Sequence, residues 1–136
     1  MSALDPIALG LPHREPFIFI DVVTELVPGQ SAVCTKTFPS EEPFFRGHFP
    51  GEPLVPGVIL AEALAQTAGI AAGEQGKAFR LTAIKGMKFA APARPGEVIR
   101  LAARKVGGVA GLHQFDTEAR VKDQCVAAGV IVLAEV

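Results

Sequence analysis

Residues 54–73, LVPGVILAEALAQTAGIAAG, decide how this chain can fold. The stretch predicts a helix over Val58–Ala72 that is apolar or small on almost every side. It is long enough to suggest a membrane span, but it is rich in alanine and carries Glu62 and Gln66 near its centre. A helix buried inside protein explains these features better. Such a helix must be surrounded, most economically by one curved sheet wrapped around it.

Runs typical of β-strands lie on both sides of this helix. The predicted strands cover residues 16–27, 30–38, 81–90, 97–106, 111–121 and 124–136. Short connections join them, which favours a mostly antiparallel sheet. The 16–27 run shows little polar alternation, so we expect it to be well buried. The order of elements predicts an α+β fold, with residues 1–136 forming a single domain.

Composition excludes several classes of function. The net charge of −1 offers no basic field to nucleic acid. The two cysteines, Cys34 and Cys125, have no metal-site spacing and favour a reduced, cytoplasmic protein. The N-terminal residues lack the basic start and apolar block of a signal peptide. We therefore expect neither a nucleic acid nor a membrane as partner.

Glu62 is the one charge in the predicted helix. It shares a stripe with Val58, Gln66 and Gly69, because residues three or four apart lie on the same helix face. Burying a carboxylate without partners disfavours its ionised form, which suits a general acid. Two structural alternatives carry similar weight: pairing with a buried arginine, or exposure from the end of the helix.

A loop rich in proline and glycine precedes the helix and carries His48. Residues 39–57 hold five prolines and three glycines, too many for a regular element, together with phenylalanines that should pack the loop down. His48 lies fourteen residues before Glu62 and is the side-chain type that titrates near neutrality, although a lone loop histidine is more often structural. Gly57 opens the helix, where free N–H groups can hold an anionic oxygen. Together these groups make a plausible centre for proton abstraction.

The same residues carry a family resemblance. The block GHFPGEPLVPGVILAEALAQTAG (47–69) closely resembles the 3-hydroxyacyl-[acyl-carrier-protein] dehydratases of fatty acid synthesis, the FabZ type. The similarity continues in LPHREPFIFID (11–21), EPFFRGHFP (42–50), IKGMKFAAPARPGE (84–97) and VAAGVIVLAEV (126–136). It therefore covers nearly the whole chain in the right order.

The resemblance implies a hot-dog fold, a curved antiparallel sheet wrapped around one long central helix. It implies a homodimer, often assembled as a trimer of dimers (a homohexamer), with active sites at the dimer interface. The implied reaction converts a (3R)-hydroxyacyl thioester into a trans-2-enoyl thioester. The acyl group is carried on the phosphopantetheine of acyl carrier protein, and the resemblance implies no further cofactor and no metal.

The family's catalytic pair falls on His48 and Glu62, supplied by opposite subunits. The resemblance implies that His48 removes the C2 proton and that Glu62 protonates the departing C3 hydroxyl or holds the water formed. The Gly57 amide would stabilise the enolate, with the Val58 amide as a further substrate contact, and Gln66 would orient Glu62. A different division of labour, with His48 acting as both base and acid, stays open.

The chain departs from the family pattern at Glu15, Glu41 and Ala90, where Tyr, Asn and Arg are common. These changes leave the catalytic pair intact but bear on carrier docking and on chain-length gating. His13 is expected to be a structural residue of the loop, and His113 a surface residue. Four basic residues are candidates for contacting an acidic carrier protein, or for solvated faces of no further role: Arg46, Lys85, Lys88 and Arg94.

Two other functions fit the same fold. One is thioester hydrolysis, although thioesterases of this fold usually lack the histidine–proline block. The other is a catalytically silent acyl-binding scaffold, which the presence of His48, Gly57, Glu62 and Gln66 disfavours.

Overall fold

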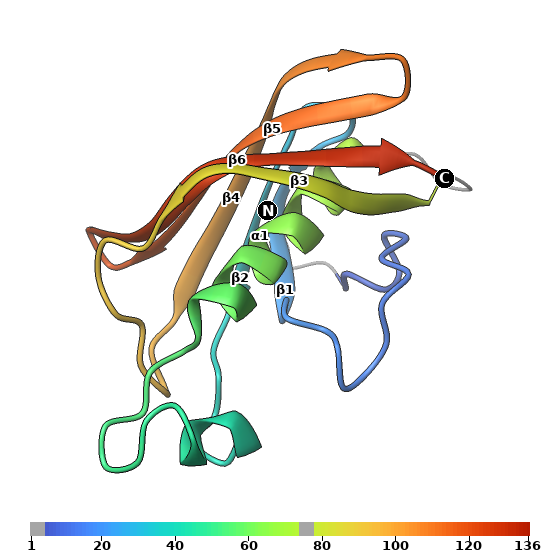
Figure 1. Ribbon diagram of the computed structural model, residues 1–136. Coiled ribbons are helices and arrows are strands. Elements are labelled where there is room, and N and C mark those ends of the chain that lie inside the picture. The colour runs from blue at the N-terminus through green and yellow to red at the C-terminus, as the bar shows by residue number, and fades with distance from the viewer. Residues whose placement is uncertain (1–4, 74–77) are drawn as a thin grey trace.

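The computed structural model describes residues 5–73 and 78–136. Within them one helix lies against one six-stranded sheet (Figure 1). The elements are β1 (Val22–Val27), β2 (Ser31–Lys36), the 3-10 turn η1 (Pro43–Arg46), α1 (Gly57–Ala72), β3 (Phe79–Lys88), β4 (Ile99–Val109), β5 (Leu112–Val121) and β6 (Gln124–Glu135). The strand order is β1-β2-β4-β5-β6-β3, and every neighbouring pair is antiparallel. The predicted α+β class is confirmed.

Helix α1 lies in the hollow of the curved sheet, which is the hot-dog arrangement (Figure 1). It contacts all six strands, and eleven of its sixteen residues are buried. The core between helix and sheet includes fully buried side chains from both layers, among them Leu64, Leu101, Phe115 and Ile131. Burial of these large apolar groups is the main source of stability in the fold.

The sheet wraps around α1 as predicted, and it leaves one side of the helix open in a single chain. Val58 is 76% exposed, and Ile59, Glu62 and Gly69 are only partly buried. A sheet curved over a helix covers the sides it faces and leaves the opposite side open. This open side of α1 carries Glu62 between Val58 and Gly69, whereas Gln66 from the same stripe is buried.

A glycine ends α1 and ties it to the β1–β2 turn. Gly73 has a left-handed φ of 64°, a conformation that glycine adopts without steric cost. A Cβ at this position would lie 2.9 Å from the Gly29 nitrogen, too close for any side chain. The Gly29 N–H in turn donates to the Ala71 carbonyl at 2.8 Å, which satisfies one of the free carbonyls at the helix end.

The first predicted strand, residues 16–27, is shorter than expected. Strand β1 begins only at Val22, and only Val23 in it is fully buried, whereas we expected the run to be well buried. The preceding residues 18–20 are buried but form no strand. The Phe19 N–H and the carbonyl of the preceding Phe17 bond to a helix side chain, Gln66, rather than to a neighbouring strand. The other five strands match their predicted bounds to within three residues.

Strands β1 and β3 lie at the two edges of the sheet. Strand β3 pairs irregularly with β6, with register shifts between Leu81 and Ala83 and between Lys85 and Lys88. Gly129 on β6 lies so close to β3 that a Cβ there would meet the Met87 Cα at 2.6 Å. The close approach explains why a residue without a side chain stands in the middle of a strand.

Candidate active site

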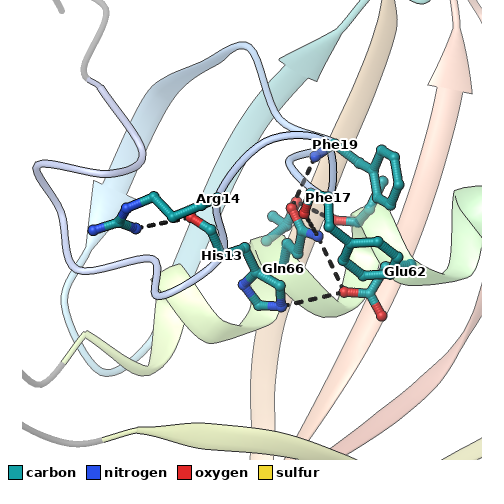
Figure 2. A network of polar contacts seen from close by, with 8 residues as sticks. His13, Arg14, Phe17, Phe19, Glu62 and Gln66 are labelled. Atoms are coloured by element: carbon teal, nitrogen blue, oxygen red, sulfur yellow. Dashed lines mark hydrogen bonds and ion pairs between the residues drawn. The ribbon is translucent and has the colours of Figure 1, made fainter. Parts of the chain in front are cut away.

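Glu62 lies on the open side of α1, and another residue of the same helix orients its side chain. Its Oε2 accepts a hydrogen bond of 3.1 Å from Nε2 of Gln66, one helical turn further on (Figure 2). Gln66 is only 1% exposed, and its amide is fully used. Its Oε1 accepts from the Phe19 N–H at 3.0 Å, and its Nε2 also donates to the Phe17 carbonyl at 3.1 Å. These contacts to the 17–19 backbone fix the orientation of the amide that faces Glu62.

The Glu62 side chain is 20% exposed and lines a cavity of about 220 Å³. Most of the cavity wall is apolar and comes from the N-terminal segment, α1, β3 and β6: Leu9, Leu11, Ala65, Phe79, Leu81 and Leu133. The described residues place no arginine against Glu62, so the alternative of a buried Glu–Arg pair is not supported. An oriented carboxyl group at the wall of an apolar cavity is suited to proton transfer on a greasy substrate.

His13 is the residue that sequence reasoning missed. Its Nε2 lies 3.5 Å from Glu62 Oε2, and it lines the same cavity, whereas we expected it only to brace its loop (Figure 2). The two residues are 49 positions apart, and no spacing rule connects them. The one available signal was that His13 belongs to the LPHR motif shared with the family. His113, expected at the surface, is also part of a pair, with its Nε2 2.9 Å from Glu135.

His48 lies in the tight loop between η1 and α1. Its Nδ1 is 3.0 Å from the Leu54 carbonyl, and its own carbonyl accepts from the Leu54 N–H at 2.9 Å. Because a carbonyl oxygen only accepts, Nδ1 carries the hydrogen. The free electron pair is then on Nε2, the nitrogen that can take up a proton. The loop therefore presents His48 in the tautomer that a general base requires.

Gly57 and Val58 supply the first two N–H groups of α1. Among the described residues neither N–H has an acceptor, as is usual at a helix start. The Phe89 ring covers Gly57, where an added Cβ would lie 3.1 Å from the ring. Unpaired N–H groups at the positive end of a helix can stabilise a developing negative charge.

Within one chain the structure does not bring His48 and Glu62 together. Across the described residues no contact joins them, and the cavity beside Glu62 is lined by neither His48 nor Gly57. The predicted site residues thus form two groups, Glu62 with Gln66, and His48 with the start of α1.

Other features of the described chain concern partners and cofactors. Across residues 5–73 and 78–136, no three His, Cys, Asp or Glu side chains lie close enough together to hold a metal ion. Helix α1 is too short, and no other described helix is long and apolar enough, to cross a membrane. The four basic candidates, Arg46, Lys85, Lys88 and Arg94, are all exposed.

Comparison with known proteins identifies the family. A family model described as ApeI-like dehydratase matches residues 24–130. The chain is 41% identical to 3-hydroxyacyl-[acyl-carrier-protein] dehydratase FabZ of Ruminiclostridium cellulolyticum, over 91% of this chain and 90% of the relative. It is also 41% identical to the FabZ dehydratase of Roseiflexus castenholzii, over 98% and 96% of the two chains.

A solved structure with the same fold is the dehydratase heterocomplex ApeI:P from Xenorhabdus doucetiae. It matches with a TM-score of 0.81 at 16% identity, over 97% of this chain and 91% of that chain. The sequence matches, the shared fold and the oriented carboxyl group at an apolar cavity agree with one another. The chain belongs to the 3-hydroxyacyl-[acyl-carrier-protein] dehydratase family of the FabZ type.

Proposed function

We propose that this protein dehydrates (3R)-hydroxyacyl thioesters, carried on acyl carrier protein, to trans-2-enoyl thioesters in fatty acid or related lipid biosynthesis. Family membership supports the reaction class. The observation that carries the proposal is the environment of Glu62. It is a lone carboxyl group on α1, oriented by Gln66, at the wall of an apolar cavity. A thioester with a greasy acyl chain is the kind of substrate such a wall accepts.

The first step is removal of a proton from C2 by Nε2 of His48. The Leu54 carbonyl holds the ring in the tautomer that leaves this nitrogen free. As the C2–H bond breaks, negative charge develops on the thioester oxygen. The Gly57 N–H receives this charge, with the Val58 N–H as a second donor at the helix start.

The second step is loss of the C3 hydroxyl. Glu62 gives its proton to this oxygen, the C3–O bond breaks with its electron pair, and water leaves while the C2–C3 double bond forms. The enzyme is left with a protonated His48 and an ionised Glu62, and proton exchange with solvent restores both. These steps use side chains and backbone amides alone, so the proposal requires neither a metal nor a cofactor.

The site is completed by a second copy of the chain. The open side of α1 carries Val58, which is 76% exposed, and the edge strand β3 exposes Leu81 and Ile84. An apolar helix side and an unpaired strand edge are surfaces that proteins normally cover. In the proposed homodimer His48 of one subunit faces Glu62 of the other. A trimer of such dimers forms a hexamer, and sedimentation would distinguish it from a single dimer.

The carrier is the acidic partner in this proposal. Exposed basic side chains attract an acidic protein. Among them, Arg46 ends η1, and Lys88 ends β3 just before Phe89, whose ring covers Gly57 at the start of α1. The free cysteines Cys34 and Cys125 agree with a reducing compartment, and we place the reaction in the cytoplasm.

The test is incubation with 3-hydroxyacyl thioesters of several chain lengths, on carrier protein and on coenzyme A. We expect enoyl absorbance to rise without release of free thiol. Release of free thiol would instead identify a thioesterase. Inertness on every chain length, together with unchanged acyl binding in His48→Ala, would identify a silent scaffold.

A further inference from the structure

His13 contacts the same carboxylate oxygen as Gln66. Its Nε2 lies 3.5 Å from Glu62 Oε2, while Gln66 Nε2 lies 3.1 Å from that atom (Figure 2). The second oxygen of Glu62, Oε1, makes no hydrogen bond with the described residues and points away from Gln66 and His13 in Figure 2. The two oxygens of one carboxyl group are therefore in different surroundings.

The surroundings of the imidazole decide which nitrogen carries its hydrogen. His13 Nδ1 is buried, and the described residues offer it no hydrogen-bond partner. A hydrogen on Nδ1 would be a buried donor without an acceptor, which is costly. A hydrogen on Nε2 instead faces Glu62 Oε2. Among the described residues that line this cavity, the other charged side chain is Arg80, on β3.

Contacts from Arg14 and Phe17 hold His13 in place beside Glu62. The Arg14 guanidinium donates to the Leu11 carbonyl at 2.9 Å. It also donates to the His13 carbonyl at 2.8 Å (Figure 2). The Phe17 ring stacks on the imidazole, with centroids 6.1 Å apart. Arg14 of the LPHR motif thus holds its own loop in place, and the loop positions the His13 side chain so that it points at the Glu62 carboxyl group.

We propose that His13 is a positioning residue for the dehydration, acting through Glu62 together with Gln66; the inference rests on the proposed function. Gln66 donates to Oε2 and His13 Nε2 lies 3.5 Å from the same atom, so the proton that Glu62 transfers is the one on Oε1. When the Oε1–H bond breaks, Glu62 becomes a carboxylate, and its new charge is shared with the oxygen that faces Gln66 and His13. Because charged acceptors form stronger hydrogen bonds, His13 stabilises the transition state more than the ground state.

The experiment compares two substitutions of similar size at position 13. His13→Leu removes the donor and should lower kcat about tenfold to a hundredfold with little change in KM, the range for a hydrogen bond to a charged group. His13→Gln returns an N–H near the place of Nε2 and should recover most of kcat. His113→Gln alters the other His–Glu pair and should leave kcat unchanged. Thermal melts of each variant separate misfolding from loss of positioning.

A double-mutant cycle with Glu62→Gln tests whether His13 acts through Glu62. His13→Leu should cost nothing further in the Glu62→Gln background, and an equal loss in both backgrounds would overturn the proposal. Wild-type kcat in a folded His13→Leu variant would also overturn it.

A readout that does not depend on turnover is the side-chain carboxyl ¹³C resonance of Glu62, assigned by its absence in Glu62→Gln. It should move in His13→Leu and not in His113→Gln, and a resonance that stays in place would contradict the contact. If the wild-type protein dehydrates no 3-hydroxyacyl thioester, the proposed function fails, and this resonance still decides whether His13 holds Glu62.

Discussion

The surroundings of Glu62 and those of His48 differ in one instructive way. Glu62 has its orienting amide and its cavity within one chain. His48 has a rigid loop and a fixed tautomer, but across the described residues its Nε2 faces no partner and no shared cavity with Glu62. One chain therefore builds two half-sites of different completeness. In the proposed dimer, the base of each chain serves the cavity of its partner.

The largest expected effect comes from removing either reacting group. His48→Ala and Glu62→Gln should each lower kcat by about a hundredfold to ten-thousandfold, the usual range for a general acid or base. Stability should change little, because both side chains are partly exposed. Steady-state kinetics and denaturant unfolding measure the two quantities. Near wild-type kcat in Glu62→Gln would assign both proton transfers to His48.

Gly57→Ala tests the half-site around His48 without touching a titratable group. The new Cβ would lie 3.1 Å from the Phe89 ring, which is half exposed and can move aside at small cost. The added methyl group crowds the N–H proposed to receive the enolate, so kcat should fall about a hundredfold. A matched control is Gly107→Ala on β4, which lines no part of the Glu62 cavity and where an added Cβ meets nothing within 4 Å. Equal kcat in the two variants would contradict the assigned role of the helix start.

Gln66→Leu should affect stability as well as activity, unlike the two changes at reacting groups. It leaves the buried Phe19 N–H without its partner, at about 1–3 kcal/mol, and it also removes the partly buried bond to the Phe17 carbonyl. It also removes one donor from Glu62, so kcat should fall about tenfold to a hundredfold. Chemical denaturation and kinetics at one temperature separate the two effects. Unchanged stability would mean that the 17–19 segment does not depend on this amide.

The smallest expected effect on activity concerns Cys34, a buried residue of β2 that contacts α1. Burial raises the pKa of the Cys34 thiol from 9.0 to about 12, against the opposing effect of a hydrogen bond with Thr67 on α1. The unfolded chain loses this proton above pH 9 while the folded chain keeps it. Stability should therefore fall between about pH 9 and pH 12, by about 1.4 kcal/mol per pH unit at most.

Cys34→Ala isolates that contribution from the lysines and other groups that titrate in the same range. The variant should be less stable below pH 9, because a buried side chain is shortened, but it should lack the additional slope above pH 9. Parallel slopes for the two proteins would contradict the raised pKa.

Periodicity and composition were enough to predict most of the fold. The apolar run before Gly73 predicts α1 almost to the residue, and alternation predicts five of the six strands closely. The exception is the segment before Val22, where backbone groups of Phe17 and Phe19 bond to Gln66 instead of to a strand. Local propensity carries no information about a helix side chain that takes over backbone hydrogen bonds.

The candidate site was predictable in part. The spacing on α1 predicts that Glu62 and Gln66 share a face, and the hydrogen bond between them agrees. The contact between His13 and Glu62 joins residues 49 positions apart, and it depends on how the N-terminal segment folds back over the helix. The open side of α1 was also missed, since an apolar pattern shows that a surface is covered but not by which chain.

The most direct test of the two-chain site is activity in mixed dimers, made by co-expression of differently tagged chains. Combining His48→Ala with Glu62→Gln should restore about a quarter of wild-type activity, because half of randomly paired dimers contain one intact site. Combining wild-type chains with the His48→Ala/Glu62→Gln double variant should give mixed dimers with no activity. No recovery in the first mixture, with half-active mixed dimers in the second, would contradict the account, because it would place the imidazole and the carboxyl group of each site on the same chain.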